Sequence, residues 1–79
     1  MSRYLTKTAR GKLARTAASQ AHGKPNTHQI GEAGKVIDEL IEADPKRFID
    51  FSNVAYCTPR HEAIITAAAE KLQSQFSLF

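Results

Sequence analysis

The stretch NTHQIGEAGKVIDELIEA, residues 26–43, decides the fold. Small or apolar residues recur in it at the spacing of a helix with one buried face, and charged residues fill the positions between them. The apolar face comprises Ile30, Ala33, Gly34, Ile37, Leu40 and Ile41. Asn26, followed three residues later by Gln29, is typical of a capping box. These features together predict a helix over residues 27–43.

Three further helical segments are predicted, over residues 4–21, 45–56 and 59–76. Asp44-Pro45 and Thr58-Pro59 each place a capping side chain before a proline that suits the first helical turn. Short turns between the segments favour antiparallel neighbours. We therefore expect an all-α fold, a small bundle of about four short helices. Its predicted core consists of Leu13, Ile30, Ile37, Leu40, Ile41, Phe48, Phe51, Ile64, Ile65 and Leu72.

The first predicted helix has the weakest apolar face. Leu5, Ala9, Leu13 and Ala17 line it, and Gly11 costs about 1 kcal/mol relative to alanine in a helix interior. Because so little apolar area is available, we expect this helix to be partly frayed. The chain is thus interpreted as one domain over residues 1–79, with a basic segment over 1–24, a helical body over 27–76 and a C-terminal peptide over 75–79.

The composition excludes several classes of protein. Seventy-nine residues allow one small domain and leave little chain for an enzymatic pocket, so we expect neither an enzyme nor a cofactor. His22, His28 and Cys57 lack the spacing of a metal site, and none is predicted. The single cysteine excludes an internal disulfide and suits a reducing, cytoplasmic location. No apolar run approaches the roughly 20 residues that a membrane span needs.

Charge is distributed unevenly along the chain. Residues 1–31 hold six basic residues and no acid, whereas the remainder holds all eight acids. This asymmetry favours contact with a polyanion, most naturally the phosphates of DNA. The predicted nucleic-acid-binding residues are Arg3, Lys7, Arg10, Lys12 and Arg15. The alternative is a solvated basic face that only keeps the protein soluble.

Sequence-specific recognition of DNA is not predicted. The segment over 45–56 would have to act as the recognition helix of a helix-turn-helix motif, and it offers only Lys46 and Arg47, at its start. Base readout normally draws on several polar side chains along one exposed helix face. Contacts with DNA are therefore expected to be non-specific.

The C-terminal pentapeptide QFSLF, residues 75–79, is the most specific feature of the sequence. It resembles the short peptide by which bacterial replication and repair proteins dock on the β sliding clamp of DNA polymerase III. That motif requires glutamine, any residue, serine or aspartate, leucine and phenylalanine. The resemblance implies that Gln75 forms amide hydrogen bonds at the rim of the clamp groove, that Ser77 takes the third position, and that Leu78 and Phe79 fill the apolar pocket. A looser resemblance, through Gln73, Phe76 and Phe79, exists to the clamp peptide of archaea and eukaryotes.

A second interpretation makes the same residues the end of a helix. Leu72, Phe76 and Phe79 are spaced as on one helical face and would extend the core, although Leu78 points away from that stripe. Our leading hypothesis is a small replication accessory or inhibitor that docks on the clamp and contacts adjacent DNA, of a kind that suits a phage or plasmid. The alternatives are a nucleic-acid-binding regulator and a protein–protein inhibitor whose basic end meets an acidic surface.

Overall fold

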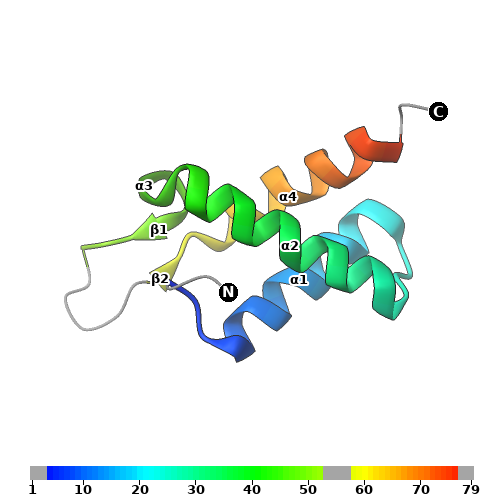
Figure 1. Ribbon diagram of the computed structural model, residues 1–79, viewed down its shortest axis with the longest axis horizontal. Helices are drawn as coiled ribbons and strands as arrows, with labels where there is room; N and C mark the ends of the chain where they lie inside the picture. The colour runs from blue at the N-terminus through cyan, green and yellow to red at the C-terminus, as the bar shows by residue number, and fades with distance from the viewer. Residues whose placement is uncertain (1–3, 53–57, 77–79) are drawn as a thin grey trace.

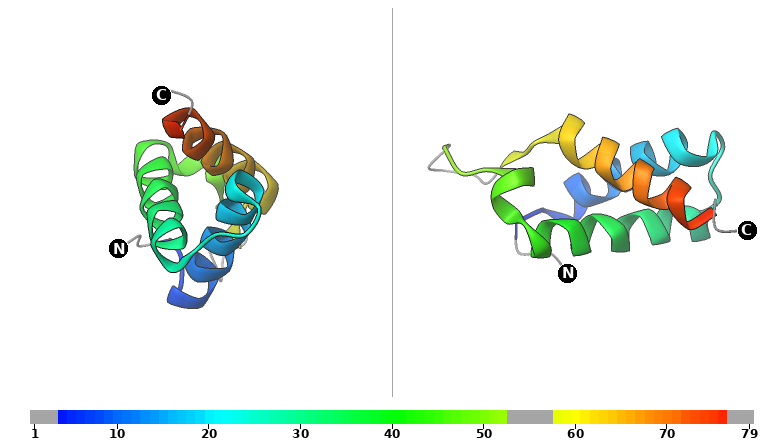
Figure 2. Two further views of the ribbon diagram at one scale, coloured as in Figure 1. Left: turned by 90° about the vertical axis from the view of Figure 1, so that its right-hand side faces the viewer. Right: turned by 90° about the horizontal axis from the view of Figure 1, so that it is seen from above.

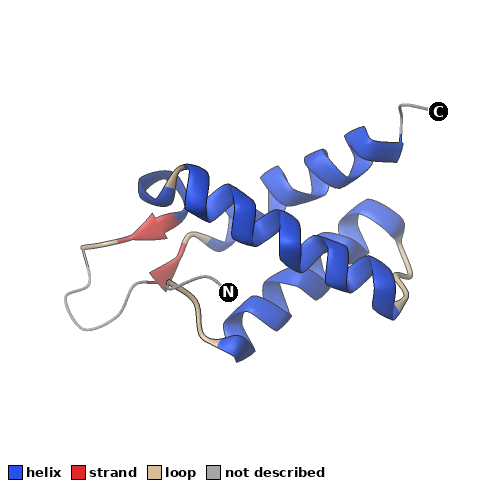
Figure 3. Ribbon diagram, viewed as in Figure 1, coloured by secondary structure: helices blue, strands red, loops and turns tan. Residues whose placement is uncertain are grey.

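The computed structural model describes residues 4–52 and 58–76, with side chains up to Ser74. Three long helices dominate this part of the chain: α1 (Lys7–His22), α2 (Thr27–Ala43) and α4 (His61–Phe76). Between α2 and α4 lie a single-turn helix, α3 (Pro45–Phe48), and an antiparallel pair of two-residue strands, β1 (Ile49–Asp50) and β2 (Thr58–Pro59) (Figures 1 and 3). The predicted small helical bundle is confirmed.

The start of α2 is the capping box that the sequence predicts. The Asn26 side-chain oxygen accepts a hydrogen bond from the Gln29 backbone N–H at 2.8 Å, and the Gln29 side-chain oxygen accepts one from the Asn26 backbone N–H at 2.9 Å. The preceding helix, α1, ends at Gly23, whose φ of 78° is a left-handed conformation that favours glycine. These two signals set the short turn that reverses the chain between α1 and α2.

The predicted helix over residues 45–56 is wrong over residues 49–52, and residues 53–56 lie outside the described part of the chain. α3 ends at Phe48, and Ile49, which is fully buried, continues into the core from an extended backbone. Phe51, which we placed in the core, is 48% exposed, and its ring meets the Tyr4 ring edge to face at 5.9 Å. A helix would have placed Phe48 and Phe51 on one face, whereas the extended chain after Phe48 turns Ile49 inward instead.

Local hydrogen bonds favour this early end of the helix. The Asp50 carboxylate accepts hydrogen bonds from the backbone N–H and the hydroxyl of Ser52, and these bonds lower the pKa of Asp50 below its usual value. Such a side-chain turn competes with helical hydrogen bonding. Its stabilising effect is present when Asp50 is ionised and is lost as the pH falls through that lowered pKa.

The predicted helix start at Thr58-Pro59 is also wrong. Both residues belong to β2, which pairs with β1, and α4 begins two residues later at His61. The Arg60 backbone N–H donates to the Phe48 carbonyl at 2.7 Å, which draws this part of the chain towards the end of α3.

The three long helices enclose one core. α1 and α4 run in the same direction, α2 runs against both, and the end-on view shows them around a common centre (Figure 2). Of the ten predicted core residues, Ile30, Leu40 and Ile65 lie at the edge of the core and only Phe51 lies outside it. The buried cluster is Leu13, Ala14, Ala17, Ala18, Ala33, Val36, Ile37, Ile41, Phe48, Ile49, Ile64, Ala68 and Leu72.

α1 is a full member of this bundle. It packs against both α2 and α4, and Leu13, Ala17 and Ala18 are each at most 1% exposed. The expectation of a frayed N-terminal helix followed from its few large apolar side chains. Its packing gives that expectation no support, because small residues bury completely where helices come close together.

The two phenylalanines that flank the end of α3 provide a test of this fold. Phe48→Ala is expected to destabilise the protein by about 3–5 kcal/mol, because Phe48 is 2% exposed within the core. Phe51→Ala is expected to cost less than about 1.5 kcal/mol, chiefly through its contact with Tyr4. Urea unfolding followed by circular dichroism measures both, and equal losses would contradict the placement of Phe51 outside the core.

Candidate nucleic-acid interface

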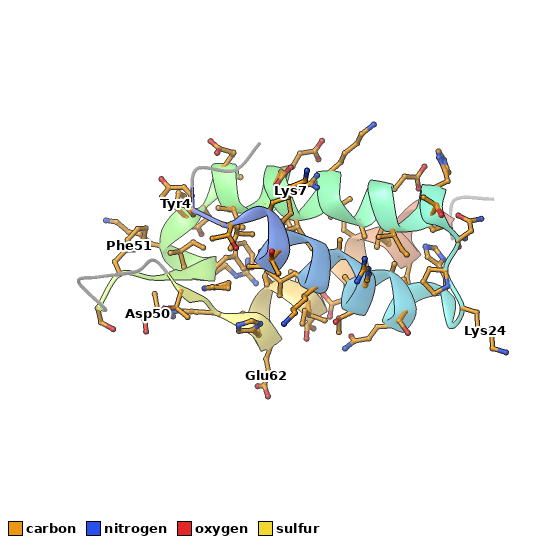
Figure 4. The ribbon with its side chains drawn as sticks, turned by 90° about the horizontal axis from the view of Figure 1, so that it is seen from below. Tyr4, Lys7, Lys24, Asp50, Phe51 and Glu62 are labelled. Carbon is orange, nitrogen blue, oxygen red and sulfur yellow. The ribbon has the colours of Figure 1, made fainter. Side chains whose placement is uncertain are left out.

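The exposed face of α1 gathers three basic side chains around one hollow. Lys7, Lys12 and Arg15 are all exposed, and together with Thr8 and Gly11 they line a shallow depression in the surface. Figure 4 views the molecule with α1 in front and Lys7 labelled near its start. Thr8 and Gly11 are not among the residues predicted from the sequence. The signal that places them here is helical spacing, since Gly11 lies four residues from both Lys7 and Arg15.

No acid offsets these charges within the helix. α1 contains no aspartate or glutamate, and in the described part of the chain Lys7, Lys12 and Arg15 form no ion pair. Lys7 also lies in the first turn, where the helix dipole is positive and a cation is unfavourable by about 0.3–1 kcal/mol. An anion bound beside this turn would relieve that repulsion.

Arg10 takes a different position from the other predicted residues. Its Nε atom donates to both carboxylate oxygens of Asp38 in α2, at 3.0 and 2.9 Å, and the pair is half-buried. The guanidinium lies against Gly34, where an added Cβ would stand 2.8 Å from Nη2. Gly34 is thus a close-packing position, and it makes room for an arginine side chain rather than for a helix backbone.

The five predicted nucleic-acid-binding residues are therefore not equivalent. Lys7, Lys12 and Arg15 lie on the solvent-exposed face of α1, hereafter the open face, whereas Arg10 joins α1 to α2. Arg3 lies outside the described residues. All five are basic and close together in the chain, but the partner of Arg10 is an acid 28 residues away, which no local pattern in the sequence indicates.

Four of the eight acids of the protein lie on α2, and three of them form ion pairs. Besides Asp38, Glu39 approaches Lys71 of α4 at 3.4 Å, and Glu32 lies 3.0 Å from His28. In Figure 4, Glu62 at the start of α4 points away from α1. The face of α1 that carries Lys7, Lys12 and Arg15 is thus basic and without acids of its own.

The second predicted site, the C-terminal peptide, begins on the last turn of α4. Leu72 is fully buried, whereas Gln73 and Ser74, which follow it, are exposed. The backbone of Gln75 is helical and α4 continues to Phe76. The side chains of Gln75 and Phe76, and residues Ser77, Leu78 and Phe79 as a whole, lie outside what the structure describes.

Two further sequence expectations concern metals and membranes. In the parts of the chain that the structure covers, no group of three or more histidine, cysteine, aspartate or glutamate residues could hold a metal ion, and Cys57 lies outside those parts. None of the described helices is both long and apolar enough to cross a membrane.

Charge neutralisation separates the role of Arg10 from that of its neighbours. Arg10→Gln is expected to lower the free energy of unfolding by about 1–2 kcal/mol, because it leaves Asp38 half-buried without its partner. Lys12→Gln, a matched change on the exposed face, is expected to alter it by less than about 0.5 kcal/mol. Thermal unfolding in low salt measures both. Equal stability of the two variants would mean that the Arg10–Asp38 pair does not hold α1 to α2.

Comparisons with known proteins add no assignment to this geometry. Neither a protein-family model nor a curated protein nor a solved structure matches the chain.

Proposed function

We propose that this is a small non-enzymatic protein that binds nucleic acid through phosphate contacts from the open face of α1. One observation carries the proposal: Lys7, Lys12 and Arg15 line one hollow on a firmly packed helix that has no acid of its own. Lysine, arginine and hydroxyl side chains are the usual donors to phosphate oxygens, and Thr8 adds a hydroxyl to the same hollow.

Binding of this kind is independent of base sequence. Phosphate contacts position a protein on nucleic acid without reading its bases. The element that a helix-turn-helix motif would use for reading, α3, is a single turn of four residues. Nothing comparable to a recognition helix is therefore present between α2 and α4 in the described residues.

The buried face of α1 favours nucleic acid over a membrane surface as the polyanion. A helix that binds a membrane inserts its apolar face among the lipids. In α1 that face is already used, because Leu13, Ala17 and Ala18 are buried against α2 and α4. Only cations, hydroxyls and polar side chains are left for an external partner.

Removal of the three charges tests the proposal. The variant Lys7→Gln, Lys12→Gln, Arg15→Gln is expected to lose most of its affinity for duplex DNA at low salt while its melting temperature stays nearly unchanged. Three phosphate contacts imply that the parent's log–log dependence of affinity on salt has a slope of about −3. Fluorescence anisotropy with a labelled duplex at several salt concentrations measures both quantities.

A matched control corrects for net charge. Lys24, Lys35 and Lys46 are exposed and lie outside the hollow, so changing all three to glutamine removes the same charge from elsewhere. This control is expected to retain most of the binding and a similar salt slope. Equal losses in the two triple variants would show that net charge, and not the face of α1, governs binding.

A second candidate function, docking on the bacterial β sliding clamp, rests on the pentapeptide at residues 75–79. The described side chains of α4 are consistent with it, because Leu72 is the last buried one and the next two, Gln73 and Ser74, are exposed. Because α1 and α4 run in the same direction, the end of α4 at Phe76 and the start of α1 at Lys7 lie at opposite ends of the bundle (Figure 1). A molecule that engaged clamp and DNA at the same time would gain apparent affinity from the second contact.

Truncation of the two apolar residues of the peptide distinguishes docking from core packing. Leu78→Ala with Phe79→Ala is expected to abolish clamp binding, which in the parent should have a dissociation constant near the micromolar range, about −8 kcal/mol. The melting temperature should change little. Gln73→Ala is the matched control, because it leaves the bacterial motif intact. Calorimetry with purified clamp measures the binding, and thermal unfolding measures the melting temperature. If the parent fails to bind at tens of micromolar, or if the double variant has a much lower melting temperature, the helix-end interpretation is supported instead.

A further inference from the structure

Gly11 lowers the stability of α1, and the fold does not need a glycine at this position. A glycine in a helix interior is less favourable than alanine because its backbone loses more freedom on folding. The backbone of Gly11 has no positive φ, unlike that of Gly23. A Cβ built on Gly11 would meet nothing within 4 Å, whereas one on Gly34 would press on Arg10. Neither conformation nor packing explains this glycine.

What surrounds Gly11 is the hollow on the open face of α1. Lys7 lies one turn before Gly11 and Arg15 one turn after it, so that all three follow one line along the helix. Thr8 and Lys12 line the same hollow from the adjacent line. The missing side chain therefore leaves bare backbone between three cations and a hydroxyl.

We propose that a backbone phosphate of the bound nucleic acid lies directly against Gly11, and we call this position the phosphate seat. The phosphate group rests against the bare helix surface, Lys7 and Arg15 donate to it from the two sides, and Lys12 and the Thr8 hydroxyl donate from the flank. A methyl group at position 11 would hold the phosphate further from all four donors, and each charge interaction weakens with distance. This inference rests on the proposed function and locates where the ligand is held.

The seat predicts that a stabilising substitution weakens binding. Gly11→Ala is expected to raise the melting temperature by about 4–8 °C, because alanine is the better helix former and the added methyl meets no atom. Its affinity for duplex DNA is expected to fall about tenfold at low salt, the equivalent of one charge-assisted contact. Most substitutions that remove function are neutral or destabilising, so these opposite changes are a distinctive result.

The chain offers a matched control at Gly31. This glycine is exposed within α2, has no positive φ, and would also leave open space around an added Cβ. Gly31→Ala should therefore raise the melting temperature by a similar amount and leave DNA binding unchanged. A loss of affinity shared by both variants would attribute the effect to stability or rigidity and would overturn the seat.

A double-mutant cycle completes the test. Gly11→Ala is introduced into the variant that lacks Lys7, Lys12 and Arg15, and affinity for the same duplex is measured by anisotropy. The proposal expects little further loss, because the methyl group then has no bound phosphate to displace. If Gly11→Ala binds as tightly as the parent while the triple variant does not, the seat is wrong and the proposed function stands. If the parent binds vesicles of anionic lipid but no DNA, both are wrong.

Discussion

The position of α1 depends on how closely it approaches its two neighbours. Leu13 is the one large side chain that α1 buries completely, and its other buried residues are alanines. Small residues at contact positions let helices pack close together, so that backbone and methyl groups make the contacts that longer side chains make elsewhere. Ala33 of α2 and Ala68 of α4 are fully buried in the same core. This stripe of small residues fixes which side of α1 faces outward, and thereby brings its basic side chains together.

The acids of α2 decide which of those basic side chains are available. Asp38 forms an ion pair with Arg10 of α1, whose guanidinium lies against Gly34 and would have to shift if residue 34 had a Cβ. Lys71 of α4 approaches Glu39, which lies on α2 as Asp38 does. Exposed pairs such as Lys71–Glu39 contribute little stability. Their effect is on the distribution of charge: α2 pairs with one basic side chain from each neighbour, and the basic residues on the far side of α1 are left without partners in the described chain.

The sequence predicts all three long helices from apolar residues at helical spacing, although the capping signal at Thr58-Pro59 misplaces the start of α4. The capping box at Asn26 and the apolar spacing of residues 30–41 are local signals, and α2 follows them closely. The error at residues 49–52 arises because Phe48 and Phe51 have helical spacing, while the decisive hydrogen bonds come from Ser52 to Asp50 and from Arg60 to Phe48. The second of these joins residues that are distant in sequence. The pairing of Arg10 with Asp38 escapes prediction for the same reason. The basic character of the open face, by contrast, follows from the absence of acids over residues 1–31.

The parallel arrangement of α1 and α4 has a consequence for how the protein is made. α1 packs as extensively against α4 as against α2, although the whole of α2, α3 and the strand pair separates them in the chain. During synthesis, α1 and α2 leave the ribosome before α4 and can pair through their short turn. The part of the apolar side of α1 that packs on α4 then has no partner. The growing chain therefore exposes an alanine-rich surface until α4 leaves the ribosome. The face of α1 that carries Lys7, Lys12 and Arg15 is therefore held in a fixed position only after α4 has been made.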